Sequence, residues 1–135
     1  MFSNMFSDLS GASSSLSIGD NLQAEVNTTD ATPSVGLSLP VPEERAIKVT
    51  AQVTAKKSDG TKRAMWTLSG LFYRNTGGNV TAEGDPVVID SHVSDGCAYV
   101  ATLAANTTTQ MVEVQITGTT SETVYWTVQA NYFRR

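Results

Sequence analysis

The sequence is poor in the residues that most often build catalytic and metal centres. It contains one histidine, His92, and one cysteine, Cys97. A single thiol excludes a disulfide within the chain, and one histidine with one cysteine excludes a multi-histidine or thiolate-cluster metal site. The GxSxG, phosphate-loop and HExxH motifs, which mark hydrolases, nucleotide-binding proteins and metalloproteases, are also missing. We therefore expect neither a metal nor a cofactor.

One short segment gathers groups that could take part in catalysis. Residues 90–95, DSHVSD, include two aspartates, two serines and the histidine. Neighbouring residues on a strand point to opposite faces, whereas a catalytic triad needs its side chains to converge. We interpret the segment as a polar strand end and expect no enzymatic activity. A carbohydrate-active enzyme or free lectin is the alternative, because thirteen carboxylates could supply a glycosidase pair.

The sequence also lacks a long hydrophobic run. No segment approaches the roughly 20 apolar residues that a membrane-spanning helix needs. The N-terminal segment has no Lys or Arg before its apolar residues and contains Asp8, so it does not match a secretory signal. With 135 residues, 40% of them hydrophobic, the chain can bury a single core. We expect one small globular domain and no membrane partner.

What the first nine residues do contain is a cluster of large apolar side chains. These are Met1, Phe2, Met5, Phe6 and Leu9. Their spacing would place them on one stripe of a helix. The following stretch, GASSSLSIGD, has little bulk and no periodicity, which is typical of a linker. We predict that residues 1–19 form an arm that anchors the chain to a partner; packing of the arm onto its own domain is the alternative.

Charge is distributed unevenly along the chain. Residues 1–44 carry six acidic residues and no basic one, whereas residues 45–74 carry seven basic residues and one acidic one. Four of the basic residues, Lys56, Lys57, Lys62 and Arg63, flank a predicted hairpin. This hairpin could bind the acidic arm of a neighbouring copy, and neutralisation within one domain explains the pattern equally well. The net charge of −4 and the lack of interleaved aromatic residues argue against a nucleic-acid partner.

From residue 20 onward the sequence alternates as half-buried strands do. The clearest strand covers residues 46–55, and the SDGT segment at 58–61 predicts a tight turn after it. Other predicted strands cover residues 22–26, 35–39, 64–74, 86–93, 97–104, 110–117 and 123–133. The pattern predicts an all-β domain over residues 20–135, an antiparallel β-sandwich of about eight strands for which jelly-roll connections are one option. We place Trp66 and Trp126 in its core, with ligand stacking as the alternative.

Several local features of this body occur together between residues 27 and 132. They lie in the segments TDATPSVGLSLPVPEERAIKVTAQVTAKKSDGTKRAMWTLSGLFYR and MVEVQITGTTSETVYWTVQA. The TDATP start, the Pro-Val-Pro-Glu lead into a long strand, the SDGT hairpin and the two tryptophan strands resemble a β-sandwich domain of tailed-bacteriophage structural proteins. The resemblance implies a virion component, such as part of a tail fibre, a spike or another surface structure, that is synthesised in the cytoplasm of the bacterial host.

The resemblance and the apolar arm together suggest a mechanical role. A small β-domain with an adhesive arm, standing without a fibre trunk, suits a capsid cement or decoration protein that binds neighbouring copies of the major capsid protein. Residues Met1, Phe2, Met5, Phe6 and Leu9 would be the anchor, and a homotrimer at a symmetry axis would multiply weak contacts. The alternative is a tail-fibre or baseplate component that binds host glycans through exposed aromatic residues such as Tyr73, Tyr99 or Tyr125.

Overall fold

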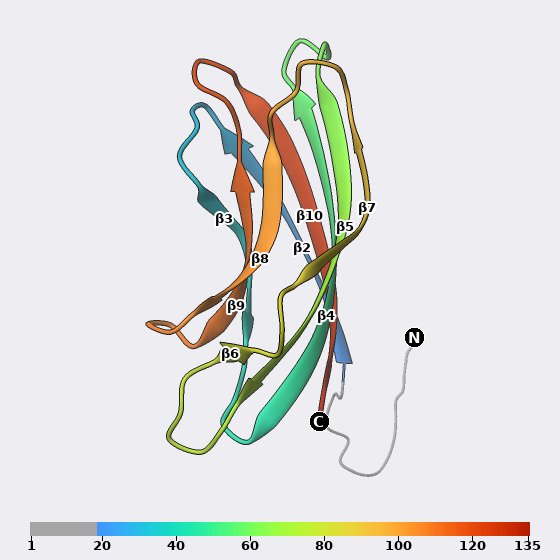
Figure 1. Ribbon diagram of the computed structural model, residues 1–135. Helices are drawn as coiled ribbons and strands as arrows, with labels where there is room; N and C mark the ends of the chain where they lie inside the picture. The colour runs from blue at the N-terminus through green and yellow to red at the C-terminus, as the bar shows by residue number, and fades with distance from the viewer. Residues whose placement is uncertain (1–18) are drawn as a thin grey trace, which may run out of the picture.

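The computed structural model describes residues 19–135, which form a two-layered antiparallel β-sandwich (Figure 1). The larger sheet contains β2 (Gly19–Thr28), β10 (Val124–Arg134), β4 (Arg45–Lys57) and β5 (Arg63–Arg74) in that spatial order, and both β6 (Thr81–Ala82) and β7 (Val87–Val93) pair with β5. The smaller sheet contains β3 (Ser34–Pro40), β9 (Met111–Thr117) and β8 (Val100–Asn106) in that order. The predicted all-β sandwich is confirmed, and the two-residue β6 is the strand that the sequence did not indicate.

Local sequence explains the hairpin between β4 and β5. Alternate residues of β4 are buried, as its apolar and polar pattern predicts. At the turn, Gly60 has φ of 77°, a conformation that glycine adopts without strain. The carboxylate of Asp59 accepts hydrogen bonds from the amide and hydroxyl of Thr61, at 2.9 and 2.6 Å, and these bonds lower the pKa of Asp59 to about 2. The predicted SDGT turn is confirmed.

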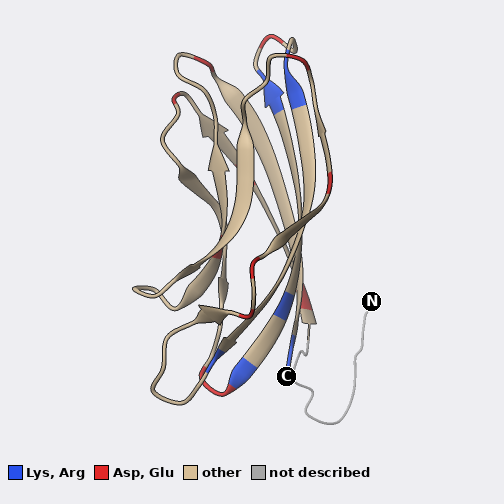
Figure 2. Cartoon of the chain, viewed as in Figure 1, with Lys and Arg blue, Asp and Glu red and all other residues tan. Residues whose placement is uncertain are grey.

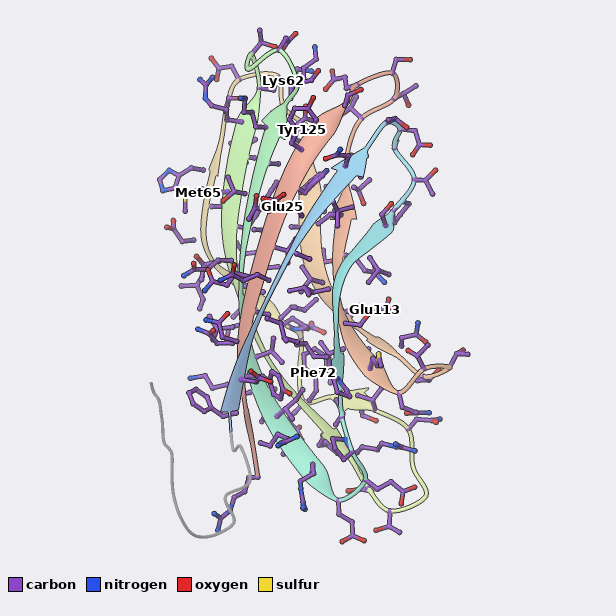
Figure 3. All side chains as sticks on the ribbon, turned by 180° about the vertical axis from the view of Figure 1, so that it is seen from behind. Glu25, Lys62, Met65, Phe72, Glu113 and Tyr125 are labelled. Atoms are coloured by element: carbon purple, nitrogen blue, oxygen red, sulfur yellow. The ribbon has the colours of Figure 1, made fainter. Side chains whose placement is uncertain are left out.

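The core lies between the two sheets and is built around aromatic side chains. Trp66 and Trp126 stack with ring centroids 5.8 Å apart, and Tyr99 packs against Trp126 at the same centroid separation. The indole Nε1 of Trp126 donates a hydrogen bond to the buried Thr28 Oγ1 at 2.9 Å. Phe72 fills the opposite end of the same core (Figure 3). The two tryptophans are therefore core residues, as the sequence predicted.

Two predicted strands differ from the structure. The prediction placed Val35, Leu37 and Leu39 on one face, but the pairing register shifts between Val35 and Leu37 and leaves Val35 46% exposed. Gly36 lies at this shift, where an added Cβ would approach Val128 Cγ2 to 2.9 Å, so the bulge lets the backbone pack closely against β10. The strand predicted from residue 97 begins instead at Val100, after a turn that contains Gly96 with φ of 75°.

The two sheets differ in width, and this decides which surfaces stay open. The smaller sheet covers the inner face of the larger one only in part, because it has three strands against six. All seven residues of β7, at the side of the larger sheet, are consequently exposed. The outer face of the larger sheet has no covering layer among residues 19–135. No helix in this range could span a membrane.

Candidate glycan-binding face

Strand register aligns the outward-facing residues of the larger sheet in rows across its strands. The two central rows consist of amide and hydroxyl side chains: Gln23, Gln129, Gln52 and Thr67 in one, and Asn21, Asn131, Thr50 and Ser69 in the next. These side chains are exposed or half-buried. Amides and hydroxyls both donate and accept hydrogen bonds, as sugar hydroxyl groups do. The face therefore offers a continuous polar surface without a dominant charge at its centre.

The upper end of this face combines an aromatic ring with two cations. Tyr125 on β10 pairs with Lys56 on β4, and Lys56 pairs with Arg63 on β5. Side chains paired in this way across antiparallel strands lie about 5 Å apart at their Cβ atoms. Tyr125 is 46% exposed, so its ring is accessible to solvent. Figure 3 shows Tyr125, Glu25 and Met65 in this upper part of the sheet.

A shallow groove of about 540 Å³ crosses β4, β5 and β7 beside this row. Lys56 and Arg63 line one end, and Thr54, Met65 and His92 line the next row. Met65 is 38% exposed and supplies an apolar surface within the groove. An aromatic ring can pack against the apolar face of a sugar, and a Lys–Arg pair can bind a carboxylate, sulfate or phosphate group. The arrangement suits binding of an extended acidic carbohydrate.

The predicted basic hairpin divides into two pairs of residues with different surroundings. Lys62 Nζ lies 2.6 Å from Glu122 Oε2, and Lys57 Nζ lies 3.4 Å from Asp59 Oδ2. Neutralisation within the domain, one of the two explanations of the charge pattern, therefore applies to these two lysines. Lys56 and Arg63 point to the outer face, in the cationic region at the upper end of β4 and β5 (Figure 2). The role of the hairpin in binding a neighbouring copy stays a prediction.

Glu122 links the hairpin to the core rather than to a ligand. Its carboxylate accepts hydrogen bonds from Lys62 Nζ at 2.6 Å and from the Tyr99 hydroxyl at 2.8 Å. The bond from Lys62, and to a lesser extent the bond from Tyr99, lower the pKa of Glu122. Burial and the hydrogen bond to Glu122 raise the pKa of Tyr99. Tyr99 is buried, so the expectation that it faces solvent is wrong. Tyr73 is half-buried, and Tyr125 is the exposed tyrosine of the three.

The segment at residues 90–95 does not assemble a triad in the structure. His92 Nε2 lies 3.4 Å from Asp90 Oδ1, and both side chains are largely exposed. Ser91 lies between them on β7 and therefore points to the opposite face. Ser94 Oγ accepts a hydrogen bond from the amide of Arg63 at 3.0 Å. Within residues 19–135, no group of three His, Cys, Asp or Glu side chains is placed to hold a metal ion.

The predicted anchor lies outside the described residues. Met1, Phe2, Met5, Phe6 and Leu9 all precede Gly19, where the described structure begins. The arm at residues 1–19, and the capsid cement function and trimer that depend on it, stay predictions.

The sequence did not indicate the row of Tyr125, Lys56 and Arg63 on the outer face as one site. Its polar residues are visible in the alternation of residues 46–55 and 123–133, but only the strand order shows that Tyr125 and Lys56 are neighbours.

The solved structures to which this chain shows a likeness include two phage tailspike proteins. The tailspike protein of Acinetobacter baumannii phage AM24 is 7% identical, with a TM-score of 0.46 over 84% of this chain and 26% of that one. The tailspike protein of Acinetobacter phage vB_ApiP_P1 is 14% identical, with a TM-score of 0.34 over 91% of this chain and 23% of that one. The likeness is partial and concerns fold. This chain spans about a quarter of either tailspike protein.

No protein-family model matches the chain, and no curated protein matches it. The comparisons therefore lend no support to the predicted capsid cement function.

Proposed function

We propose that this chain is a domain of a phage tail-associated virion protein that binds acidic glycans of the host surface. The observation that carries the proposal is the row Tyr125–Lys56–Arg63, which lies next to the groove on the outer face of the larger sheet. The resemblance of the sequence to virion β-sandwich domains supports the proposal that the chain belongs to a phage particle. The proposal takes up the alternative of a glycan-binding tail component and assigns the contact to a sheet face rather than to loops.

The surroundings of the row favour a polysaccharide over a small molecule. The groove is open and shallow, and the rows of amides and hydroxyls extend from it along the sheet. A polymer can gain many weak hydrogen bonds on such a surface, with Tyr125 providing a stacking platform. A small ligand usually needs a deeper cavity that buries most of its surface.

The charges favour an acidic polymer. No ion pair within residues 19–135 involves Lys56 or Arg63, whereas Lys57 and Lys62 are paired within the chain. Arg63 Nη1 is held by the carbonyl of Gly60 at 2.6 Å, which fixes the guanidinium near the row. Because the whole chain has a net charge of −4, these two cations form a local positive site on an acidic protein. Such a site selects acidic over neutral sugars.

The test measures binding of the full chain to purified acidic and neutral capsular polysaccharides by affinity electrophoresis. We expect retardation by acidic polymers, weakened by added salt, and a loss of affinity of at least about tenfold in Tyr125→Ala and in the double variant Lys56→Ser/Arg63→Ser. Phe133→Ala and Lys48→Ser are matched controls, because these residues lie at the other end of the same face. Equal losses in the controls, or no retardation, would contradict the proposal.

The same samples can be assayed for newly released reducing ends, which separates binding from cleavage. The proposal predicts no release above the level of a protein-free blank. Release that depends on the added chain would show a glycan-degrading enzyme instead of a binding domain.

A further inference from the structure

Strand β7 exposes an unusual amount of aliphatic surface. Its Val87, Val88, Ile89 and Val93 side chains are 56, 55, 62 and 45% exposed. Within residues 19–135, β7 pairs with β5 alone and leaves its other edge open. Both faces of the strand are uncovered, because the smaller sheet ends before it. An aliphatic strand with an open edge is a template for pairing with another strand.

The backbone groups that point to this open edge can be assigned from the existing ladder. The amide of Ser94 donates to the carbonyl of Arg63 at 2.9 Å, in continuation of the pairing of Ala64 with Val93. In an antiparallel ladder, alternate residues bond to the same neighbouring strand. His92 therefore directs its backbone toward β5, and Ser91 and Val93 direct their amide and carbonyl groups toward the open edge.

One register makes β7 complementary to itself. When two β7 strands run antiparallel with Ser91 on the two-fold axis, each Asp90 lies opposite the His92 of the other copy. Each Ile89, which the pairing of β7 with β5 skips, then comes next to the other copy's Val93. Because Asp90 and His92 bond to β5, their cross-copy pair is of the non-hydrogen-bonded type, in which side chains approach most closely. If the two-fold axis passed through Asp90 instead, the Asp90 carboxylates of the two copies would face each other.

We propose that β7 is an interface between two copies of this chain, joined edge to edge in this register. Each Asp90 carboxylate accepts a hydrogen bond from the imidazole of the other copy, and the aliphatic pairs cover surface that the single sandwich leaves open. The two larger sheets become one continuous sheet across the junction. Their outer faces lie side by side, and both grooves, each of which includes His92, border the two-fold axis.

β7 also has two features that oppose pairing with another strand. A bulge interrupts its pairing with β5 between Thr67 and Leu68, and Asp90 places a charge on the strand. Bulges and charges are the devices by which proteins keep edge strands apart. If they serve only that purpose, the full chain is monomeric and the order of Asp90 and His92 along the strand has no effect on association.

The experiment measures the association of the full chain by analytical ultracentrifugation, without glycan. We expect a dimer whose dissociation constant rises at least about tenfold in Ile89→Lys, and similarly in His92→Asp, which places two carboxylates opposite each other at each junction. The double variant Asp90→His/His92→Asp exchanges the two groups and keeps them complementary. It should restore the dissociation constant to within about threefold of that of the unchanged chain.

The matched control is Val35→Lys, at a valine that is 46% exposed and lies on β3, at the far edge of the smaller sheet. It should leave the dimer intact. A monomeric full chain overturns the proposal, as does a double variant no stronger than His92→Asp alone. An oligomer that withstands Ile89→Lys overturns it too, because its contacts then lie elsewhere, residues 1–18 included. None of these outcomes depends on glycan binding, so the interface and the proposed function can fail independently.

Discussion

At the scale of single residues, two polar side chains hold the core in place. Thr28, 5% exposed, accepts the indole proton of Trp126, a residue 98 positions away in the chain. Glu122 joins Lys62 of the hairpin to Tyr99 of the core. The sequence predicted that Trp126 is buried, because it lies on the apolar face of an alternating strand. The sequence could not predict that Thr28 is the acceptor. The chain has many threonines, and Thr28 comes close to Trp126 only when β2 and β10 pair.

Replacing Thr28 with valine tests this contact. Thr28→Val keeps the shape of the side chain but removes the acceptor of the buried Trp126 Nε1. A buried donor without a partner costs about 1–3 kcal/mol, so the free energy of unfolding should fall by that amount. Urea denaturation followed by tryptophan fluorescence measures it. Thr29→Val, at an exposed neighbour, is the control, and an equal loss there would contradict the account.

The Glu122 contact predicts a dependence of stability on pH. Its hydrogen bonds lower the pKa of this carboxyl below the ordinary value of 4.5. The stabilisation is therefore fully present above the ordinary pKa and is lost as the pH falls through the lower folded-state value. Glu122→Gln should reduce the thermal midpoint at pH 7, and the difference from the unchanged chain should shrink as the pH drops below the ordinary pKa of 4.5. A difference that stays constant from pH 7 to pH 3 would refute this role.

At the scale of elements, alternation predicted the strands that have one buried face and failed where a strand deviates from that pattern. β4 and β10 alternate along their whole length and were identified from their sequences. β3 was assigned a regular face, but its bulge at Gly36 turns Val35 outward. The strand predicted over residues 86–93 is present as β7. Its exposed aliphatic surface depends on the widths of the two sheets, which no local pattern reveals.

The turn after β9 shows how closely two elements can approach. A Cβ added at Gly118 would lie 2.6 Å from Thr28 Oγ1 and 3.2 Å from the carbonyl oxygen of Asp30. Gly118→Ala therefore forces β2 and the turn apart and disturbs the acceptor of Trp126, at a cost of about 1–3 kcal/mol. Differential scanning calorimetry should show a lower midpoint. Gly84→Ala is no matched control because Gly84 has φ of 73°. Gly78→Ala is the control, because Gly78 has no positive φ and a Cβ added there would come no closer than 3.3 Å to another atom, the carbonyl oxygen of Asn75. A loss in Gly78→Ala as large as that in Gly118→Ala would contradict the close-approach explanation.

At the scale of the whole molecule, function follows from what the sandwich leaves uncovered. One side of the larger sheet packs on the core, and the other presents rows of amides, hydroxyls, Tyr125 and two cations to solvent. The composition of this face was readable in the sequence as the polar half of each alternation. Its assembly into one surface was not, because β10 pairs with both β2 and β4 from the other end of the chain. This is why the sequence suggested glycan-binding aromatics but not their site.

The most direct test of the proposed face is an NMR titration of the full, ¹⁵N-labelled chain with an acidic capsular oligosaccharide. The account predicts amide shift changes centred on Tyr125, Lys56 and Arg63 that spread along the outer rows of β4 and β10, and smaller changes with a neutral oligosaccharide. Shift changes centred instead on the turn at residues 75–79, at the other end of the sandwich, or equal responses to both sugars, would contradict it.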